Sequence, residues 1–275
     1  MTPLLTDLAA LSRNRARARD MLWQHEAVLE VQDRLSEVNK PLTEIAVITD
    51  FPDVWRGLAG SLTIIPHAET LALREGAYDA VIHAMGLHWA NDPVGQLVQA
   101  RRALRPDGLL IALLFGGQTL FELRASLAQA EAEVSGGLSP RVLPMGEIRD
   151  LGGLLQRAGL ALPVADSFTK TLIYRDLPHL CADLRAFGEV NALAARPRHF
   201  VRRAIFTRAG EIYAQHYGQD YGQGGGRIPA TFEVLCLTGW APHAGQQKPL
   251  RPGSAAARLA DALGAAEIIL PQKGS

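Results

Sequence analysis

The 275-residue chain lacks most of the features that mark secreted, metal-stabilised or nucleic-acid-binding proteins. Its two cysteines, Cys181 and Cys236, form no C-x-x-C pair and no zinc-ligand spacing, and two are too few for a disulfide framework. The 28 basic side chains are balanced by 28 acidic ones. This balance argues against a nucleic acid or an anionic membrane as partner, since either would call for a basic surplus. We therefore expect a protein of a reducing compartment, located in the cytoplasm.

Long hydrophobic runs are also missing. The longest apolar run, residues 108–115, is far shorter than the roughly 18 residues of a membrane helix, so it predicts a buried strand and no transmembrane segment. The start of the chain is rich in arginine, but it contains Asp7 and Asp20 and no apolar core, which argues against a secretory signal.

Residues 6–40 are predicted to be helical, because apolar residues such as Leu22, Leu29 and Leu35 recur at helical spacing and no glycine or proline intervenes until Pro41. Four alternating arginines would fall all round this helix. We interpret them as a solvated face: Arg13, Arg15, Arg17 and Arg19.

From residue 41 onward short apolar runs alternate with helical segments. The predicted strands are 45–48, 62–65, 78–82, 109–115 and 231–238, and the predicted helices are 93–104, 118–134, 147–158, 177–187 and 200–217. Residues 105–108 have the composition of a turn, and Gly159 is predicted to end a helix. The alternation predicts an α/β fold with a doubly wound, mostly parallel sheet.

The expected organisation has four parts. They are an N-terminal helical segment (1–40), an α/β domain (41–175 with 227–262), an inserted helical cap (176–226) and a flexible tail (263–275). Two helices inserted before the last strand would cover the carboxyl edge of the sheet, where such folds bind ligands. A helix precedes the glycine run 222–226 and a strand follows it, so we interpret the run as a hairpin loop and not as a phosphate cradle.

His88 and Trp89 are the clearest candidates for chemistry. They follow the strand at 78–82 and should lie beside the binding crevice, as a proton carrier and a stacking wall, although they could equally pack under the cap. His67 and Glu69, combined with His83 or His88, could form an iron site of two histidines and one carboxylate, but nothing else supports it and no metal is expected. A G-x-S-x-G motif is absent, which disfavours a serine hydrolase.

Three segments resemble the fourth- and fifth-strand region of class I S-adenosylmethionine (AdoMet)-dependent methyltransferases. They are YDAVI at 78–82, LHWANDP at 87–93 and ALRPDG at 103–108. The most similar branch contains the malonyl-carrier-protein methyltransferases of biotin synthesis (BioC-like) and the complex I assembly factor that hydroxylates an arginine. Segments that resemble the assembly-factor subgroup in particular are 188–193, 211–213, 227–233, 238–240 and 249–255. The resemblance covers residues 13–262.

The resemblance implies a seven-strand type of sheet with an antiparallel last strand and AdoMet over the carboxyl ends of the first strands. His88 and Trp89 would then face the methyl acceptor, with His88 as an optional base. The implied cofactor contacts follow three predicted strands: Thr49, Asp50, Phe51, His67, Met85 and Gly86.

Two departures from the family pattern stand out. The family's first strand ends in a D-x-G-x-G-x-G turn that lets the backbone close over the methionine part of AdoMet, whereas this chain has Asp50, Phe51 and Pro52 there and no glycine. Only residues 62–65 can supply a strand between the strands at 45–48 and 78–82. One strand–helix unit, which normally carries the acid that holds the ribose, is therefore expected to be missing.

Three hypotheses remain open from the sequence. The chain is a working methyltransferase with a remodelled AdoMet site, a catalytically degenerate relative that binds a protein partner through the helical cap, or a peptidyl-arginine hydroxylase like the assembly factor.

Overall fold

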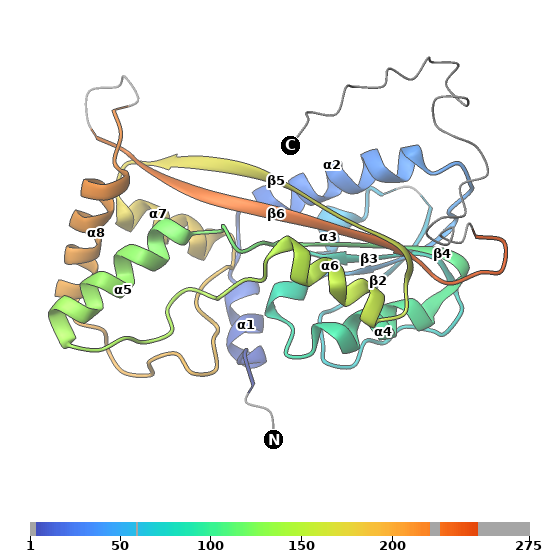
Figure 1. The fold of residues 1–275 in the computed structure, drawn as a ribbon, viewed down its shortest axis with the longest axis horizontal. Coiled ribbons are helices and arrows are strands. Elements are labelled where there is room, and N and C mark those ends of the chain that lie inside the picture. The colour runs from blue at the N-terminus through green and yellow to red at the C-terminus, as the bar shows by residue number, and fades with distance from the viewer. Residues whose placement is uncertain (1–3, 59, 221–225, 247–275) are drawn as a thin grey trace, which may run out of the picture. The chain divides into compact units, whose positions relative to one another are not determined.

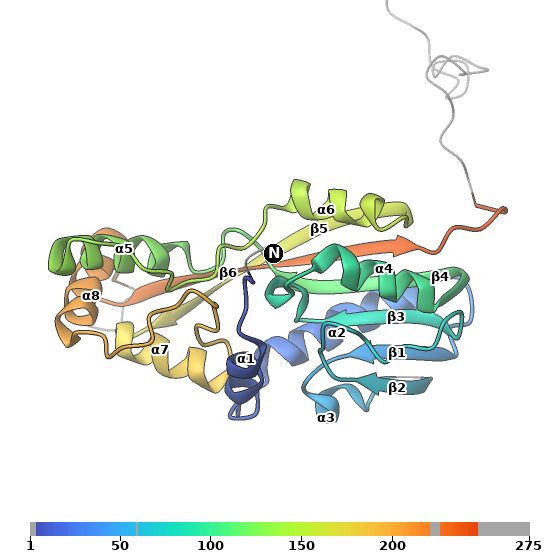
Figure 2. The same ribbon diagram turned by 90° about the horizontal axis from the view of Figure 1, so that it is seen from below.

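The computed structural model describes residues 4–58, 60–220 and 226–246, and Figures 1 and 2 show their arrangement. The helices are α1 (Leu8–Arg15), α2 (Leu22–Glu37), α3 (Pro52–Trp55), α4 (Pro93–Ala103), α5 (Phe121–Ser135), α6 (Ile148–Arg157), α7 (Leu177–Ala186) and α8 (Arg203–Tyr217), with a 3-10 turn η1 (Leu87–Trp89). The strands are β1 (Glu44–Ile48), β2 (Ser61–Ile65), β3 (Tyr78–Ala84), β4 (Leu104–Phe115), β5 (Ala161–Tyr174) and β6 (Ile228–Trp240). The predicted tail and most of the glycine run lie outside these residues.

The strands form one sheet in the order β2-β1-β3-β4-β6-β5. The pairs from β2 to β4 are parallel, and β6 runs antiparallel to both of its neighbours. This confirms the predicted mostly parallel α/β sheet with an antiparallel last strand. Residues 66–77 contain no helix or strand, so one strand–helix unit is missing between β2 and β3, as the spacing predicted. The strand order reverses between β1 and β3, and a ligand crevice is expected at their carboxyl ends.

Helices cover both faces of the parallel part of the sheet (Figure 2). On one face α2 and α3 pack with alternate residues of the strands, such as Val47 and Ile82. On the other face α4 and α6 pack with the intervening residues, such as Ile48 and Val81. Because helices cover both faces of the sheet, the sequences of these strands are unbroken runs of apolar residues.

The prediction of one helix over residues 6–40 is wrong. The chain forms α1 and α2, separated at residues 16–21, where the backbone N–H groups of Arg19 and Asp20 both donate to the carbonyl oxygen of Ala186. The interpretation of the arginines as a solvated face holds for Arg13, Arg17 and Arg19 but fails for Arg15, which is 4% exposed. The break turns α1 so that Arg15, its last residue, faces the sheet.

The segment at 105–108 is not a free turn, because β4 already begins at Leu104. The register between β3 and β4 shifts here, and Asp107 has a φ of 60°. Asp79 stabilises this region. Its carboxylate accepts hydrogen bonds from the N–H groups of Thr43 and Glu44 and from the Thr43 hydroxyl, and it pairs with Arg105 at 2.6 Å.

The helical cap, α7 and α8, lies beyond the carboxyl ends of the parallel strands, where the long strands β5 and β6 extend past the end of β4. β4 ends opposite Val234, while β5 and β6 continue pairing to Tyr174 and Ile228. The helices α7 and α8 lie at this end together with α5, which packs along α8 (Figure 1). Among the described residues, no helix combines the length and apolar character required to cross a bilayer.

Candidate functional site

The carboxyl ends of β1 and β3 meet at a buried arginine that comes from α1. The Arg15 guanidinium donates to the Asp50 carboxylate at 2.9 Å and to the carbonyl oxygen of Met85 at 2.9 Å. It also lies 3.1 Å from His67 Nδ1 and 3.4 Å from a carboxylate oxygen of Glu189. The guanidinium therefore connects the ends of two strands, the loop after β2 and the loop after α7.

Two partly buried carboxylates, those of Asp50 and Glu189, pair with the guanidinium of Arg15. Burial alone would raise the pKa of Asp50, but hydrogen bonds and charges from His67 and Arg15 outweigh it and hold this pKa below its ordinary value. Burial likewise opposes ionisation of Glu189, whereas His88, Arg15 and Trp89 lower its pKa to about 2. Both groups are carboxylates at neutral pH.

Glu189 links this network to the two predicted catalytic residues. Its carboxylate accepts a hydrogen bond from Trp89 Nε1 at 2.6 Å and lies 3.3 Å from His88 Nε2. His88 Nδ1 lies 3.4 Å from the backbone N–H of Phe115 and can accept from it. His88 and Trp89 are thus both brought to the site, on η1, and both are held by Glu189.

The structure places the predicted cofactor contacts in two groups. Asp50, His67 and Met85 meet around Arg15. Gly86 lies directly under the His67 ring, where a β-carbon would come 1.9 Å from His67 Nε2, so only glycine fits at this position.

Thr49 and Phe51 are not among the residues that contact Arg15 or line the larger cavity. Thr49 is buried, and its hydroxyl accepts a hydrogen bond from the Phe51 backbone N–H at 3.0 Å. The side chain of Phe51 is itself buried in the turn where the family has glycine.

Arg15 and Glu189 were missed by sequence reasoning. Arg15 stands in a run of arginines that gave no sign of burial. Glu189 lies in segment 188–193, which was used only as evidence of family resemblance. Its contact with Trp89 spans 100 positions of the chain, so no local pattern could have revealed it.

Two cavities lie on either side of Trp89. The larger, of about 470 Å³, has a mixed polar and apolar wall that includes Arg15, Asp50, His67, Glu69 and Gln96. The smaller, of about 180 Å³, is an apolar groove under the cap that we call the cap groove. Its wall is formed by side chains from η1, β4, β6, α5, α7, α8 and the loops between them, among them Trp89, Phe115, Leu123, Leu184, Glu189 and Phe206.

His67 and His83 line the larger cavity, and His88 belongs to η1. His83 and His88 are buried, and His67 is partly buried. The pKa values of His67, His83 and His88 are all lowered, in each case mainly because burial disfavours the charged ring. The rings of His67 and His83 lie 5.1 Å apart, and His83 Nε2 lies 3.2 Å from Gln96 Oε1.

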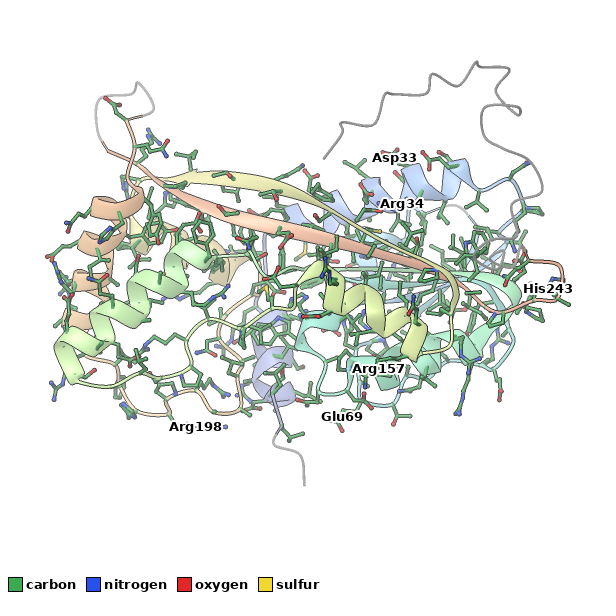
Figure 3. The ribbon with its side chains drawn as sticks, viewed as in Figure 1. Asp33, Arg34, Glu69, Arg157, Arg198 and His243 are labelled. Carbon is green, nitrogen blue, oxygen red and sulfur yellow. The ribbon has the colours of Figure 1, made fainter. Side chains whose placement is uncertain are left out.

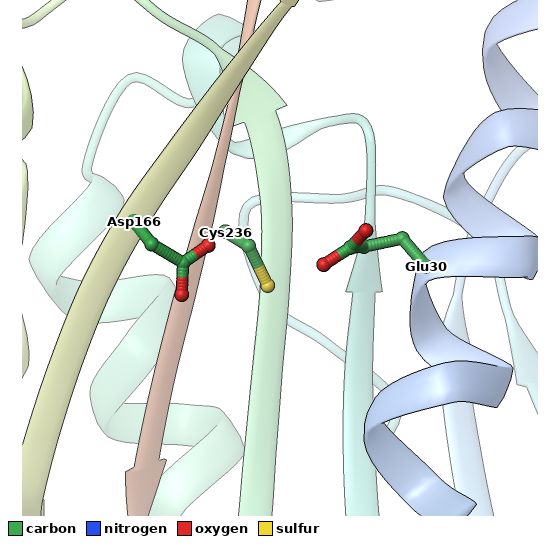
Figure 4. A group of neighbouring side chains, drawn as sticks. All are labelled: Glu30, Asp166 and Cys236. Carbon is green, nitrogen blue, oxygen red and sulfur yellow. The ribbon is translucent and has the colours of Figure 1, made fainter.

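A separate cluster has the donor types of a metal site. Glu30 of α2, Asp166 of β5 and Cys236 of β6 bring their ligand atoms within 4.8 Å of one another (Figure 4). Arg34 already pairs with both carboxylates at 2.6 Å, and burial raises the pKa of the Cys236 thiol to about 12. A paired carboxylate couple and a protonated thiol are poor metal ligands, so we assign these residues a structural role.

The chain matches known proteins along most of its length. Residues 54–112 match the family described as "Methyltransferase domain". The arginine-hydroxylase NDUFAF5 of Danio rerio is 36% identical over 198 residues, which are 72% of this chain and 60% of that protein. Human NDUFAF5 is 34% identical over 211 residues (77% and 59%). The malonyl-[acyl-carrier protein] O-methyltransferase of Laribacter hongkongensis is 36% identical over 185 residues (67% and 58%).

The chain belongs to the class I AdoMet-dependent methyltransferase superfamily, in the branch that holds both the BioC-like methyltransferases and NDUFAF5, as its motifs predicted. The matched part spans about 60% of the length of these curated relatives. The domain match begins at residue 54, after the turn in which the glycine-rich motif would stand.

The residues present do not fit AdoMet in the manner of the family. AdoMet carries a sulfonium, an ammonium and a carboxylate, and at the crevice between β1 and β3 its two cationic groups would meet the Arg15 guanidinium. The nearest carboxylate, Asp50, is already paired with that guanidinium. In addition, Phe51 and Pro52 replace the glycines that would let the backbone approach the cofactor.

Replacing Arg15 by methionine should lower the free energy of unfolding by about 3 kcal/mol, because two partly buried carboxylates, Asp50 and Glu189, would lose the buried guanidinium that pairs with them. Urea unfolding followed by circular dichroism would measure this change. Arg13→Met, which alters an exposed arginine on the same helix, is the matched control and should change stability by less than about 0.5 kcal/mol. Equal effects of the two substitutions would contradict the central role of Arg15.

The buried histidines should make the protein less stable as the pH falls below about 6.5. The unfolded chain takes up protons at these rings there, whereas the folded chain holds the rings neutral, so the free energy of unfolding decreases by up to about 1.4 kcal/mol per pH unit for each ring. Urea midpoints at several pH values between 7.5 and 5.5 would show this slope. His83→Gln should flatten it, and His179→Gln, at an exposed position, should not.

Proposed function

We propose that this chain is a member of the methyltransferase family that does not bind AdoMet and acts as a protein-binding module of the assembly type. One observation carries the proposal. The guanidinium of Arg15, tied to Asp50 and to the carbonyl of Met85, lies at the crevice between β1 and β3, where the family holds its cofactor. The carboxylate at the end of β1, Asp50, is thereby already paired with a cation of the chain itself.

The cap groove supports a binding role. Its wall is largely apolar, with aromatic side chains such as Phe115, Phe206 and Phe232. Apolar and aromatic walls of this kind receive the anchoring side chains of a partner. Phe206 is 40% exposed at the groove and is available to a partner before the groove is filled. A cytoplasmic location is part of the proposal, whereas the relatives named NDUFAF5 are mitochondrial by name.

A second candidate function is favoured by the position of Glu189. This carboxylate lines the cap groove and already accepts a guanidinium, that of Arg15. An arginine side chain of a partner that enters the groove would meet the same carboxylate, and the relatives named NDUFAF5 are arginine hydroxylases. A mass increase of one oxygen atom on an arginine of the bound partner would identify this activity.

Titration with AdoMet tests the loss of the cofactor. If the chain bound AdoMet with a Kd of about 10 µM, about 1 mM AdoMet would stabilise its folded state by about 2.7 kcal/mol. We expect no such stabilisation in thermal unfolding and no heat of binding in calorimetry. S-adenosylhomocysteine has nearly the same shape as AdoMet but lacks the sulfonium charge. Its binding therefore shows whether charge or lack of room excludes AdoMet. Binding of this neutral thioether alone would assign the loss to the charge of Arg15, and saturable binding of AdoMet would overturn the proposal.

Photo-crosslinking tests the binding role. A photoreactive phenylalanine analogue at Phe206 should capture a defined protein from a lysate of the source cells, because this position lies at the cap groove. The same analogue at Leu29, which is 57% exposed on α2, is the control and should not capture it. Leu184→Asp should abolish the capture by making the groove wall polar. Identical crosslinking patterns from both positions would contradict a partner in the groove.

A further inference from the structure

The connection between α7 and α8 concentrates positive charge on a protein whose net charge is zero. Residues 190–210 include five arginines and no aspartate or glutamate. We call residues 194–203, which carry four of these arginines, the arginine loop. Because salt screens charges beyond about 10 Å, distant acidic residues do not cancel this local surplus.

Only part of this charge is paired within the chain. Arg196 and Arg198 both approach the Asp7 carboxylate, at 2.8 and 3.2 Å. Arg202 and Arg203 are exposed, and within the described part of the chain neither side chain forms an ion pair. The arginine loop therefore keeps a positive surplus that faces solvent.

An apolar side chain projects from the middle of the loop. Phe200 has a relative exposure of 103%, so its ring contacts almost nothing in the protein. Such exposure of a large apolar ring costs free energy in water, and a ring flanked by cations on a projecting loop is a typical membrane-interface anchor.

Exposed leucines of the N-terminal segment lie beside the start of the loop. Thr6 pairs with Leu193, and the N–H of Ala194 donates to the carbonyl oxygen of Leu5 at 2.9 Å. Leu4 is 62% exposed and Leu5 37%. Figure 3 shows Arg198 on the same edge of the described protein as the start of α1.

We propose that the arginine loop docks on an anionic lipid surface, with Arg202 and Arg203 at the phosphate headgroups and Phe200 at the boundary with the acyl chains. A lipid surface is favoured over an acidic protein because Phe200 projects from the loop. The boundary of a bilayer accepts a projecting ring without a shaped pocket, whereas a protein partner would have to supply one. This inference does not depend on the function proposed above.

Co-sedimentation of the full chain with vesicles tests the proposal. Vesicles of phosphatidylcholine with about one third phosphatidylserine should bind the protein, and vesicles of phosphatidylcholine alone should not. The double substitution R202E/R203E should weaken binding at least about 25-fold, at about fivefold for each lost charge. Phe200→Ser should weaken binding about tenfold. Salt at about 0.5 M should release the protein.

Two control variants show whether the expected effects are specific to the arginine loop. R149E/R157E makes the same charge change at two exposed positions of α6, and Leu29→Ser makes an apolar-to-polar change on α2. Both variants should bind like the unchanged chain. Equal loss in R149E/R157E and R202E/R203E would overturn the proposal, as would equal binding to both kinds of vesicle. Binding to soluble polyglutamate without binding to anionic vesicles would also overturn it, in favour of an acidic protein.

Discussion

The organisation of the site depends on one ion pair, between the buried guanidinium of Arg15 and the carboxylate of Asp50. Parallel strands direct their carboxyl ends to one edge of the sheet, and the reversal of strand order between β1 and β3 leaves an opening there. In this chain the Arg15 guanidinium lies at this opening, in the wall of the larger cavity. The same guanidinium reaches Met85 and Glu189, so α1 and the loop after α7 are both held against the sheet.

This arrangement explains why a family frame can persist without the family's glycine-rich turn. Glycine is required where a ligand must approach the backbone closely. Here Phe51 is buried in the turn, and the close approach has moved to Gly86, which receives the ring of His67. In the function proposed above, the site holds a network of side chains in place of a cationic cofactor.

Sequence patterns predicted the sheet well, because its core strands are continuous apolar runs, such as residues 109–115, whose only stable place is between two layers of helices. The missing strand–helix unit was predicted from the short stretch of chain between the strands at 45–48 and 78–82, compared with the family pattern. Position after a strand also predicted that Asp50, Met85 and Gly86 would gather at one edge. The burial of Arg15 could not be predicted, because its partners lie 35 to 174 positions away and neighbouring arginines are exposed. Glu189 lies outside any helix or strand, and its contact with Trp89 spans 100 positions, so its role could not be predicted either.

Because Arg15 belongs to the same polypeptide as the site, its presence there does not depend on conditions in the cell. A diffusible cofactor occupies its crevice only to the extent that its concentration exceeds its Kd, so a site that needs one follows the metabolic state. A tethered guanidinium is present at a fixed, high effective concentration whatever the cell is making. In the function proposed above, the conformation built around Arg15 is therefore constitutive and does not vary with the supply of methyl donor.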